Sequence, residues 1–547
     1  MRLLLFVRPI QMRLRGRTLR ARAICSSVHR LARPSILCSR HLSTALRPSS
    51  TGLFITDPYN AHSLLASLKL GSFSEADMND AFDRLDKNMD DRLSIDEVRT
   101  AFQGYAARKG LSDADLGAMT ERFMELWDDD KSKTIERDEF NRHATALGKE
   151  LHPAAYQLCG GIALTALPFG ILVPFEPQLV AHLGITAAGF GAANGALFFS
   201  NVLCTIPMTE VVARRGSKQI LVGSLVLMGA SMGAVALVHS LEQLVACRLA
   251  GGVALSGIVA ANMAGVVKIG TPLNRTKNMA LLMQARNTGM ALGPAVGGLL
   301  GSLVSMQAAF AGVGLGLAGS ALVFGRIYRD VAPGDQKPID PPLQLFRTAF
   351  VSWREVLTTV PDLGALCVMS AVANGSLAGT NMTLLPLLLC DELGLGTGAI
   401  GSMLAANAVV GAVTGGQMGA LAHRVGPRLA IGAGATTVAV GMAAQPALGD
   451  ATLILGALCS AQLGLGVLTP TLAAQIQEKV LKEKPSLVMQ AMSLQNTSSF
   501  IGLVAGAGVG GAVGSQLGFA AGYQTVSMGL LVAGLATAAR FPVRKLS

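Results

Sequence analysis

The stretch RNTGMALGPAVGGLLG, residues 286–301, has a counterpart in QNTSSFIGLVAGAGVG, residues 495–510. Two more pairs share nearly the same offset of about 210 residues: HLGITAAGFG (182–191) with ELGLGTGAIG (392–401), and ARRGSK (213–218) with HRVGPR (423–428). Three matches in one order at one offset are hard to produce by shared composition alone. They predict a chain built from two related halves.

The composition around these repeats is typical of a membrane protein. Charged residues make up 14% of the 547 residues, and the mean hydropathy is +0.47. Soluble domains carry about 25% charged residues. Apolar runs recur from Ala155 onward, each close to the ~20 residues that cross a bilayer. They predict twelve spans, at 156–176, 189–212, 219–239, 243–266, 279–301, 305–327, 362–388, 398–421, 428–446, 451–473, 487–511 and 516–539.

These spans predict an all-α fold with a twelve-span helical membrane bundle, made of six-helix halves at 155–327 and 362–547. A polar, Pro-containing central loop at 328–361 joins the halves. Lys and Arg gather in alternate loops, whereas the other loops carry acids such as Asp391, Glu392 and Asp450. Because basic loops stay on the inner side, we expect both termini and the central loop on one inner face.

Two loop segments resemble the motif G-x-L-A-D-R-x-G-x-R/K of the major facilitator superfamily. GALAHRVGPR (419–428) matches it except that His423 replaces the aspartate, and TEVVARRGSK (209–218) has Ala213 at that place. In the family this carboxylate helps to lock one conformation, so the resemblance implies a weakened lock. The matching residues are Gly419, Arg424, Gly426 and Arg428 in the second half, and Arg214, Gly216 and Lys218 in the first.

Two spans of the first half resemble the same family. RLAGGVALSG, starting at Arg248, is similar to its span-4 motif, and GMALGPAVGG (289–298) to its span-5 motif G-x-x-x-G-P-x-x-G-G. The span-5 motif is enriched in proton-coupled drug antiporters. The residues that carry it are Gly289, Gly293, Pro294, Gly297 and Gly298. The resemblance covers about 155–547 and implies a secondary transporter of a small organic solute, with antiport as one mode.

Glycines four residues apart form two smooth ridges, from Gly289 to Gly301 in span 5 and from Gly502 to Gly514 in span 11. Such ridges let helices approach closely in lipid. Sliding contacts between the two bundles and tight static packing both fit the pattern. Pro294 is expected to kink span 5.

Polar side chains inside apolar spans are costly and often mark a transport pathway. The candidates are Glu176, Arg248, Arg286, Asn287, Asn374 and Gln462. The family resemblance implies that spans 1, 4, 7 and 10 line a central cavity. Two alternatives stay open, because Glu176 at the end of span 1 is also able to reach the interface, and Arg286 to serve packing near a helix end.

Two twelve-residue segments before the spans carry the oxygen pattern of a calcium loop. They are DKNMDDRLSIDE (86–97) and DDDKSKTIERDE (128–139). The predicted ligands of loop 1 are Asp86, Asn88, Asp90, the Arg92 carbonyl, Ser94 and Glu97. Those of loop 2 are Asp128, Asp130, Ser132, the Thr134 carbonyl, Glu136 and Glu139. With apolar residues flanking both loops, the segment 72–149 resembles an EF-hand pair that binds Ca2+.

The sixth position of such a loop is normally Gly, because the chain turns there with positive φ. Here it is Asp91 in loop 1 and Lys133 in loop 2. Asp tolerates that conformation better than most residues, and Lys adds a positive charge beside the ion. We therefore expect loop 1 to bind calcium more tightly than loop 2. An acidic helical hairpin that binds no ion is the alternative.

Residues 1–50 contain eleven Arg and no Lys, Asp or Glu, and thus account for the whole net charge of +11. An Arg-rich, Ser-containing head without acids is typical of an organelle transit peptide. We expect the mitochondrial inner membrane with the EF-hand pair on the matrix side. A plastid, or another membrane with a basic tail and the EF-hands in the cytosol, are the alternatives.

No catalytic pattern stands out, and the eight Cys are scattered without metal-ligand spacing, so we expect no enzyme. The leading hypothesis is a calcium-regulated transporter, monomeric, with a lipid bilayer, a small-molecule substrate and calcium as partners and no nucleic acid. The alternative is a calcium-sensing membrane receptor or scaffold that transports nothing.

Overall fold

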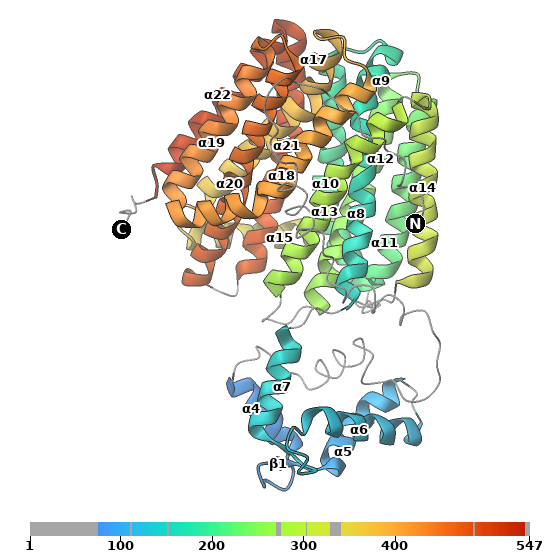
Figure 1. Cartoon of the computed structure of the whole chain (residues 1–547), viewed down its shortest axis with the longest axis vertical. Helices are drawn as coiled ribbons and strands as arrows, with labels where there is room; N and C mark the ends of the chain where they lie inside the picture. Colours follow the sequence, from blue (N-terminus) through green and yellow to red (C-terminus); the bar gives the residue numbers. More distant parts are fainter. Residues whose placement is uncertain are drawn as a thin grey trace, which may run out of the picture.

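The computed structural model describes residues 75–109, 112–149, 153–269, 275–301, 303–328, 341–484 and 487–541. The expected transit segment 1–50 lies outside these residues. The described chain is almost entirely helical and forms a long helical bundle and a smaller group of helices that precedes it in the sequence (Figure 1).

The smaller group is a pair of helix–loop–helix units. Its elements are α4 (Glu75–Leu85), β1 (Arg92–Leu93), α5 (Ile95–Lys109), α6 (Asp113–Trp127), β2 (Ile135–Glu136) and α7 (Arg137–Lys149). The two short strands pair antiparallel, with Leu93 opposite Ile135. Phe82, Phe102 and Trp127 are buried in the shared core. Burial of these aromatic side chains holds the four helices together, as the flanking apolar residues predicted.

The first bundle follows the sequence prediction closely. Its elements are α8 (Pro153–Leu172), η1 (Val173–Phe175), α9 (Glu176–Leu183), α10 (Ala187–Arg215), α11 (Ser217–Ala234), η2 (Val235–Leu237), α12 (Leu241–Ile269), α13 (Arg275–Gly301) and α14 (Met306–Ile327). The first span continues from α8, which contains Pro168, through the 3-10 turn η1, which contains Pro174, into α9.

The second bundle repeats this order. Its elements are α16 (Leu363–Gly379), the π-helical turn η3 (Thr380–Leu384), α17 (Leu385–Asp391), α18 (Thr397–Val425), α19 (Pro427–Ala444), η4 (Gln445–Ala447), α20 (Ala451–Glu483), α21 (Val488–Leu517) and α22 (Phe519–Ala538). As in the first bundle, the first span changes its helical form part-way, here through the wider π-helical turn η3. The turns after α10 and α18 also correspond, with φ of 92° at Gly216 and 83° at Gly426.

The central loop prediction needs a correction. Within 328–361 the structure forms α15 (Pro342–Thr359), an eighteen-residue helix. Pro342 stands at its first position, where the fixed φ of proline suits a helix start. The polar composition of this stretch concealed an amphipathic helix whose apolar side packs on the second bundle through Trp353 and Val356.

Eleven helices within the described residues are long and apolar enough to cross a membrane. The fifth of the twelve predicted spans, 279–301, is helix α13, and it is the one predicted span that is not among these eleven. Gln284 and Arg286 lower its hydropathy. It nevertheless packs against α8 and α18, so it is part of the bundle.

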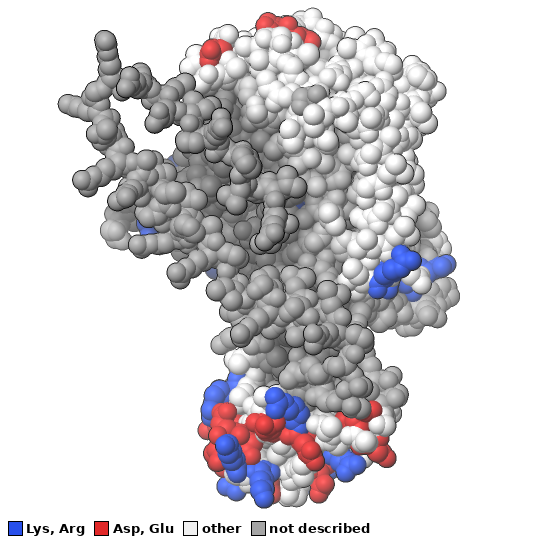
Figure 2. Space-filling view, turned by 45° about the vertical axis from the view of Figure 1, so that its right-hand side comes forward, with Lys and Arg blue, Asp and Glu red and all other residues white. Residues whose placement is uncertain are grey.

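The two ends of the bundle differ in charge. Asp391, Glu392 and Asp450 are exposed at one end, and Arg215, Arg424 and Lys482 at the other. Figure 2 shows acidic side chains at the top end of the bundle and basic ones lower down. We call these the acidic end and the basic end. From this distribution of positive charge, the sequence predicts that the basic end faces the inner side of the membrane.

Candidate functional site

The carboxylates of loop 2 (Asp128–Glu139) converge. Ligand oxygens of Asp128, Asp130 and Glu139 lie within 4.8 Å of one another. The loop backbone wraps around them, with the Lys133 amide 2.8 Å from Asp128 Oδ2 and the Glu136 amide 3.0 Å from Glu139 Oε2. Three carboxylates held this close repel one another unless a cation lies between them. The donor set, all oxygens, fits Ca2+.

Loop 1 (Asp86–Glu97) has the same backbone wrapping with one carboxylate fewer at its third position, where Asn88 stands. Glu97 Oε1 accepts from the Lys87 amide at 2.9 Å, and Oε2 accepts from the Ser94 amide at 2.9 Å and hydroxyl at 2.7 Å. Burial raises the pKa of Glu97, but the hydrogen bonds from Ser94 and from the Lys87 and Asn88 amides outweigh it and leave that pKa lowered. The carboxylate is thus held in the charged form that binds a cation.

The turn at position 6 has the conformation that a calcium loop needs. Asp91 has φ of 59° and Lys133 has φ of 68°. Both residues therefore adopt the left-handed region without being glycine, which costs on the order of 1 kcal/mol at each. In loop 2 the Ser132 hydroxyl donates to the Thr134 carbonyl at 2.9 Å, which places that predicted ligand within the loop.

Two arginines link the loops to each other, a feature that the sequence analysis missed. Arg92 Nη2 of loop 1 lies 3.2 Å from Oε1 of Glu136, a predicted ligand of loop 2. Arg137 Nη2 lies 2.5 Å from Asp91 and 2.7 Å from Asp83. The hydrogen bond to Asp91, with that to Asp83, raises the pKa of Arg137. Arg92 thus pairs with a carboxylate that the sequence predicts as a loop 2 ligand.

In the bundle, Glu176 and Arg248 form a buried ion pair. Glu176 opens α9 and Arg248 lies in α12, and each residue is only 6% exposed. Arg248 Nη2 is 3.7 Å from Glu176 Oε1, too far for a hydrogen bond. Glu176 Oε2, Arg248 Nε and Arg248 Nη2 have no hydrogen-bond partner in the described chain. A buried pair with so few partners is expensive, so its groups are available to bind something else.

The other predicted pathway residues do not join this pair. Asn374 Nδ2 donates to the Ser370 carbonyl of its own helix at 2.8 Å, and Gln462 packs beside Gly411 of α18. Arg286 lies in the interior of α13, not at a helix end, and no described carboxylate pairs with it. The side chain of Asn287 lies outside the described residues.

Contacts between the bundles concentrate toward the acidic end. Gln178 Nε2 of α9 donates to Thr397 Oγ1 of α18 at 2.6 Å. A Cβ added at Gly401 would lie 2.5 Å from the Cα of Gly298, so α13 and α18 touch through backbone there. Toward the basic end, an added Cβ at Gly415 or Gly419 of α18 meets no described atom within 4 Å. Within the described residues, the direct contacts between α13 and α18 thus lie toward the acidic end.

The glycine ridges serve two kinds of contact. An added Cβ at Gly289, Gly293 or Gly297 would strike the backbone of α8, within the same bundle. Only Gly298 and Gly301 face α18 of the other bundle. Of the two interpretations of the span-5 ridge, packing within one bundle therefore fits Gly289, Gly293 and Gly297. Gly298, turned about 100° from Gly297 around the helix, faces the other bundle.

The loop motif of the first half has a carboxylate after all. Arg214 Nε pairs with Glu210 Oε1 at 2.6 Å, one turn earlier on α10. Glu four residues before Arg is a favourable helical spacing that the sequence displayed. In the second half, Arg428 Nη1 donates to the Phe541 carbonyl at 3.5 Å and ties the start of α19 to the chain after α22.

Comparison with known proteins decides the family. The model of the Major Facilitator Superfamily matches residues 158–489, more than half of the chain. The chain belongs to the Major Facilitator Superfamily. The model of the EF-hand domain pair matches residues 75–145, so both resemblances seen in the sequence are confirmed. A Major Facilitator Superfamily member with eleven apolar helices is a multi-pass membrane protein of a family of carriers.

Curated relatives of this superfamily member include the quinolone resistance protein NorA of Staphylococcus aureus strains N315 and COL, 24% identical over 203 residues. That match covers 36% of this chain, and the chain spans about half, 51%, of the length of these relatives.

Solved structures confirm the carrier fold of the superfamily. The human organic anion transporter MFSD10 is 19% identical with a TM-score of 0.54, covering 70% of this chain and 98% of its own. The nucleoside transporter NupG is 14% identical with a TM-score of 0.57, covering 71% and 100%. A bacterial homologue of the human lysosomal transporter Spinster, in an inward-facing conformation, has a TM-score of 0.56 at 15% identity, covering 71% and 95%.

Proposed function

We propose that this protein is a proton-coupled secondary transporter of a small organic solute, regulated by calcium through its EF-hand pair. The observation that carries the transport proposal is the buried Glu176–Arg248 pair with its unsatisfied atoms. Relatives named for quinolone resistance, organic anions and nucleosides support an organic solute.

The coupling role is proposed for Glu176. A carboxylate held loosely by one cation is able to exchange that contact for a proton or for a donor group of a solute. If a proton and the solute compete for Glu176, each is carried in the opposite direction, which is antiport. A proton or a solute group that replaces one partner keeps the buried charge compensated, so the exchange avoids the cost of an unpaired buried charge.

The test uses purified full-length protein in proteoliposomes with a quinolone, a nucleoside and an organic anion as probe solutes. For the solute that is moved, an opposing pH gradient is expected to accelerate uptake. Glu176→Gln should abolish this pH drive while keeping exchange of labelled for unlabelled solute. Glu242→Gln, an exposed acid on the same helix as Arg248, is the matched control. No flux of any probe, with intact binding, would favour the receptor or scaffold alternative.

We propose that calcium closes or opens this transporter through the EF-hand pair, with loop 1 the stronger site. The proximity of Arg92 to Glu136 and the charge of Lys133 both support a weaker loop 2. Phe82 and Phe102 are buried, so calcium is proposed to expose them to the inner face of the bundle. A coupling of about 1–3 kcal/mol is typical of such regulation.

Transport is measured across calcium concentrations in the intact protein, in a variant lacking 52–149 and in Glu97→Gln. Equal rates in all three at every calcium level would remove the regulatory role.

Residues 1–50 are proposed to direct the protein to the mitochondrial inner membrane, with a plastid or another membrane as alternatives. Imaging a fusion of residues 1–60 to a fluorescent protein tests this, and a secretory or plasma-membrane signal would contradict it.

A further inference from the structure

Helix α15 carries an exposed line of alternating apolar and basic side chains. Leu343, Arg347, Phe350, Arg354 and Leu357 follow one another at spacings of four and three residues, which places them on one helical face. Leu343 is 83% exposed, Phe350 60% and Leu357 43%. We call these five residues the α15 stripe. No described carboxylate pairs with Arg347 or Arg354.

The helix packs against α10 and α21, and a charged pair joins it to the second bundle at the basic end. Glu355 Oε1 lies 2.5 Å from Lys484 Nζ at the end of α20. Asp362, just before α16, accepts from Lys479 at 2.9 Å. Only Val360, Pro361 and Asp362 separate α15 from α16, the first span of the second bundle. The helix therefore stays at the level where this span meets the membrane surface.

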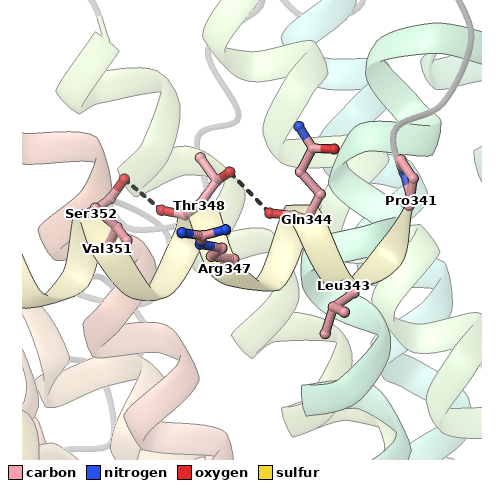
Figure 3. A pocket seen from close by; sticks show the side chains of 7 residues that line it. All are labelled: Pro341, Leu343, Gln344, Arg347, Thr348, Val351 and Ser352. Carbon is pink, nitrogen blue, oxygen red and sulfur yellow. Dashed lines mark hydrogen bonds between the residues drawn. The ribbon is translucent and has the colours of Figure 1, made fainter.

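A shallow, open hollow lies along the first half of α15 and includes Leu343 and Arg347 of the stripe. Gln344, Arg347, Thr348 and Ser352 supply its polar lining, with Leu343 and Val351 as apolar neighbours (Figure 3). The Thr348 and Ser352 hydroxyls already donate to backbone carbonyls at 3.0 Å (Figure 3). Arg347 and Gln344 are thus the free donors of the hollow, and they suit an anion such as a phosphate.

We propose that the α15 stripe lies in the headgroup layer at the basic end of the bundle and binds anionic phospholipid, with Arg347 as the phosphate contact. Three exposed apolar side chains in line are unfavourable in water but favourable at a membrane surface, where basic side chains beside them reach the headgroups. The attachment to α16 and to Lys484 gives the helix no route away from that surface.

The first test measures lipid retention. Full-length protein is taken from mixed vesicles of phosphatidylglycerol and phosphatidylcholine, and the lipids that remain bound after detergent washing are quantified. Arg347→Gln and Arg354→Gln are each expected to lower phosphatidylglycerol affinity about fivefold. Arg326→Gln, an exposed Arg in the last turn of α14, is the matched control and should leave it unchanged.

The second test measures contact directly. Phe350 packs edge-on against Trp353 with ring centroids 5.4 Å apart, so a lipid chain beside Phe350 is close enough to quench Trp353. In a Trp127→Phe background, brominated phosphatidylglycerol should quench more than brominated phosphatidylcholine, and the Arg347→Gln/Arg354→Gln variant should remove the difference. Unchanged retention and quenching in that variant, or an equal loss in Arg326→Gln, would overturn the proposal. A preference for phosphatidylglycerol that appears only with calcium and vanishes in Glu97→Gln would also overturn the proposal, because the EF-hand pair and not the α15 stripe would then bind the lipid.

Discussion

The calcium loops and the Glu176–Arg248 pair both gather charge, but they satisfy it in opposite ways. In the loops, main-chain amides surround each carboxylate, as at Glu97 and Glu139. In the bundle, the carboxylate and guanidinium keep three buried atoms without a hydrogen bond in the described chain. A site wrapped by backbone amides is preorganised for one kind of ion, whereas a poorly satisfied pair is prepared to change partners.

The largest expected effect comes from breaking the buried pair. Arg248→Leu leaves Glu176 buried without its cation and is expected to cost about 3–5 kcal/mol of stability. Replacing both residues with Leu should restore most of that stability while abolishing pH-driven transport. Thermal unfolding of the detergent-solubilised protein measures the first effect, and proteoliposome flux the second. If Arg248→Leu were as stable as the double variant, the unpaired carboxylate of Glu176 would cost no stability, which would contradict this prediction.

The next effect concerns Glu97 and Glu139, the predicted ligands at the last position of loop 1 and loop 2. Glu97→Gln and Glu139→Gln are each expected to reduce calcium affinity of their own loop at least about tenfold, because each removes a charged ligand. Titration calorimetry on the full-length protein separates the two loops. We expect the greater loss of total binding from Glu97→Gln. Intact binding in Glu97→Gln together with none in Glu139→Gln would reverse the proposed ranking.

In the absence of calcium, acid is expected to destabilise the EF-hand pair. The pKa of Glu97 lies below its ordinary value of 4.5, since hydrogen bonds from Ser94 and the loop amides outweigh burial. A lowered folded-state pKa adds stability above the unfolded value, and this stability is lost as pH falls through the folded pKa. Unfolding of the EF-hand pair, followed by Trp127 fluorescence in a Trp353→Phe background, should therefore show destabilisation starting below about pH 4.5. Glu97→Gln should flatten that dependence, and an unchanged slope would contradict it.

The smallest expected effect sharpens the contrast between the two loops. Arg92→Gln frees Glu136 from an exposed ion pair worth about 0.2–1 kcal/mol, so loop 2 should bind calcium up to about fivefold more tightly. Arg99→Gln, an exposed Arg of α5 outside both loops, is the control. Calorimetry at low ionic strength gives the clearest signal, because salt screens exposed pairs. Weaker binding in Arg92→Gln would mean that Arg92 orders the loop and does not compete with calcium.

The sequence by itself determined the two halves, eleven of the spans and the EF-hand pair, and it predicted the oxygen ligands of both loops. Local patterns are enough to predict these features, namely the hydropathy over about twenty residues for a span and the ligand spacing within twelve residues for a loop. The same local reading showed Glu210 four residues before Arg214, although its role as partner went unnoticed. It concealed α15, because an amphipathic helix and a polar loop have similar average composition.

Only the tertiary structure decided which distant residues meet. Glu176 faces Arg248, and Gly298 touches Gly401, because helices far apart in the chain pack side by side. Arg92 faces Glu136 because the short strands β1 and β2 pair. It also separated Asn374 and Gln462 from the ion pair and turned most of the span-5 glycine ridge toward α8. Periodicity gives the face of a helix on which a residue lies, but the neighbour that this face meets depends on the packing of the whole bundle.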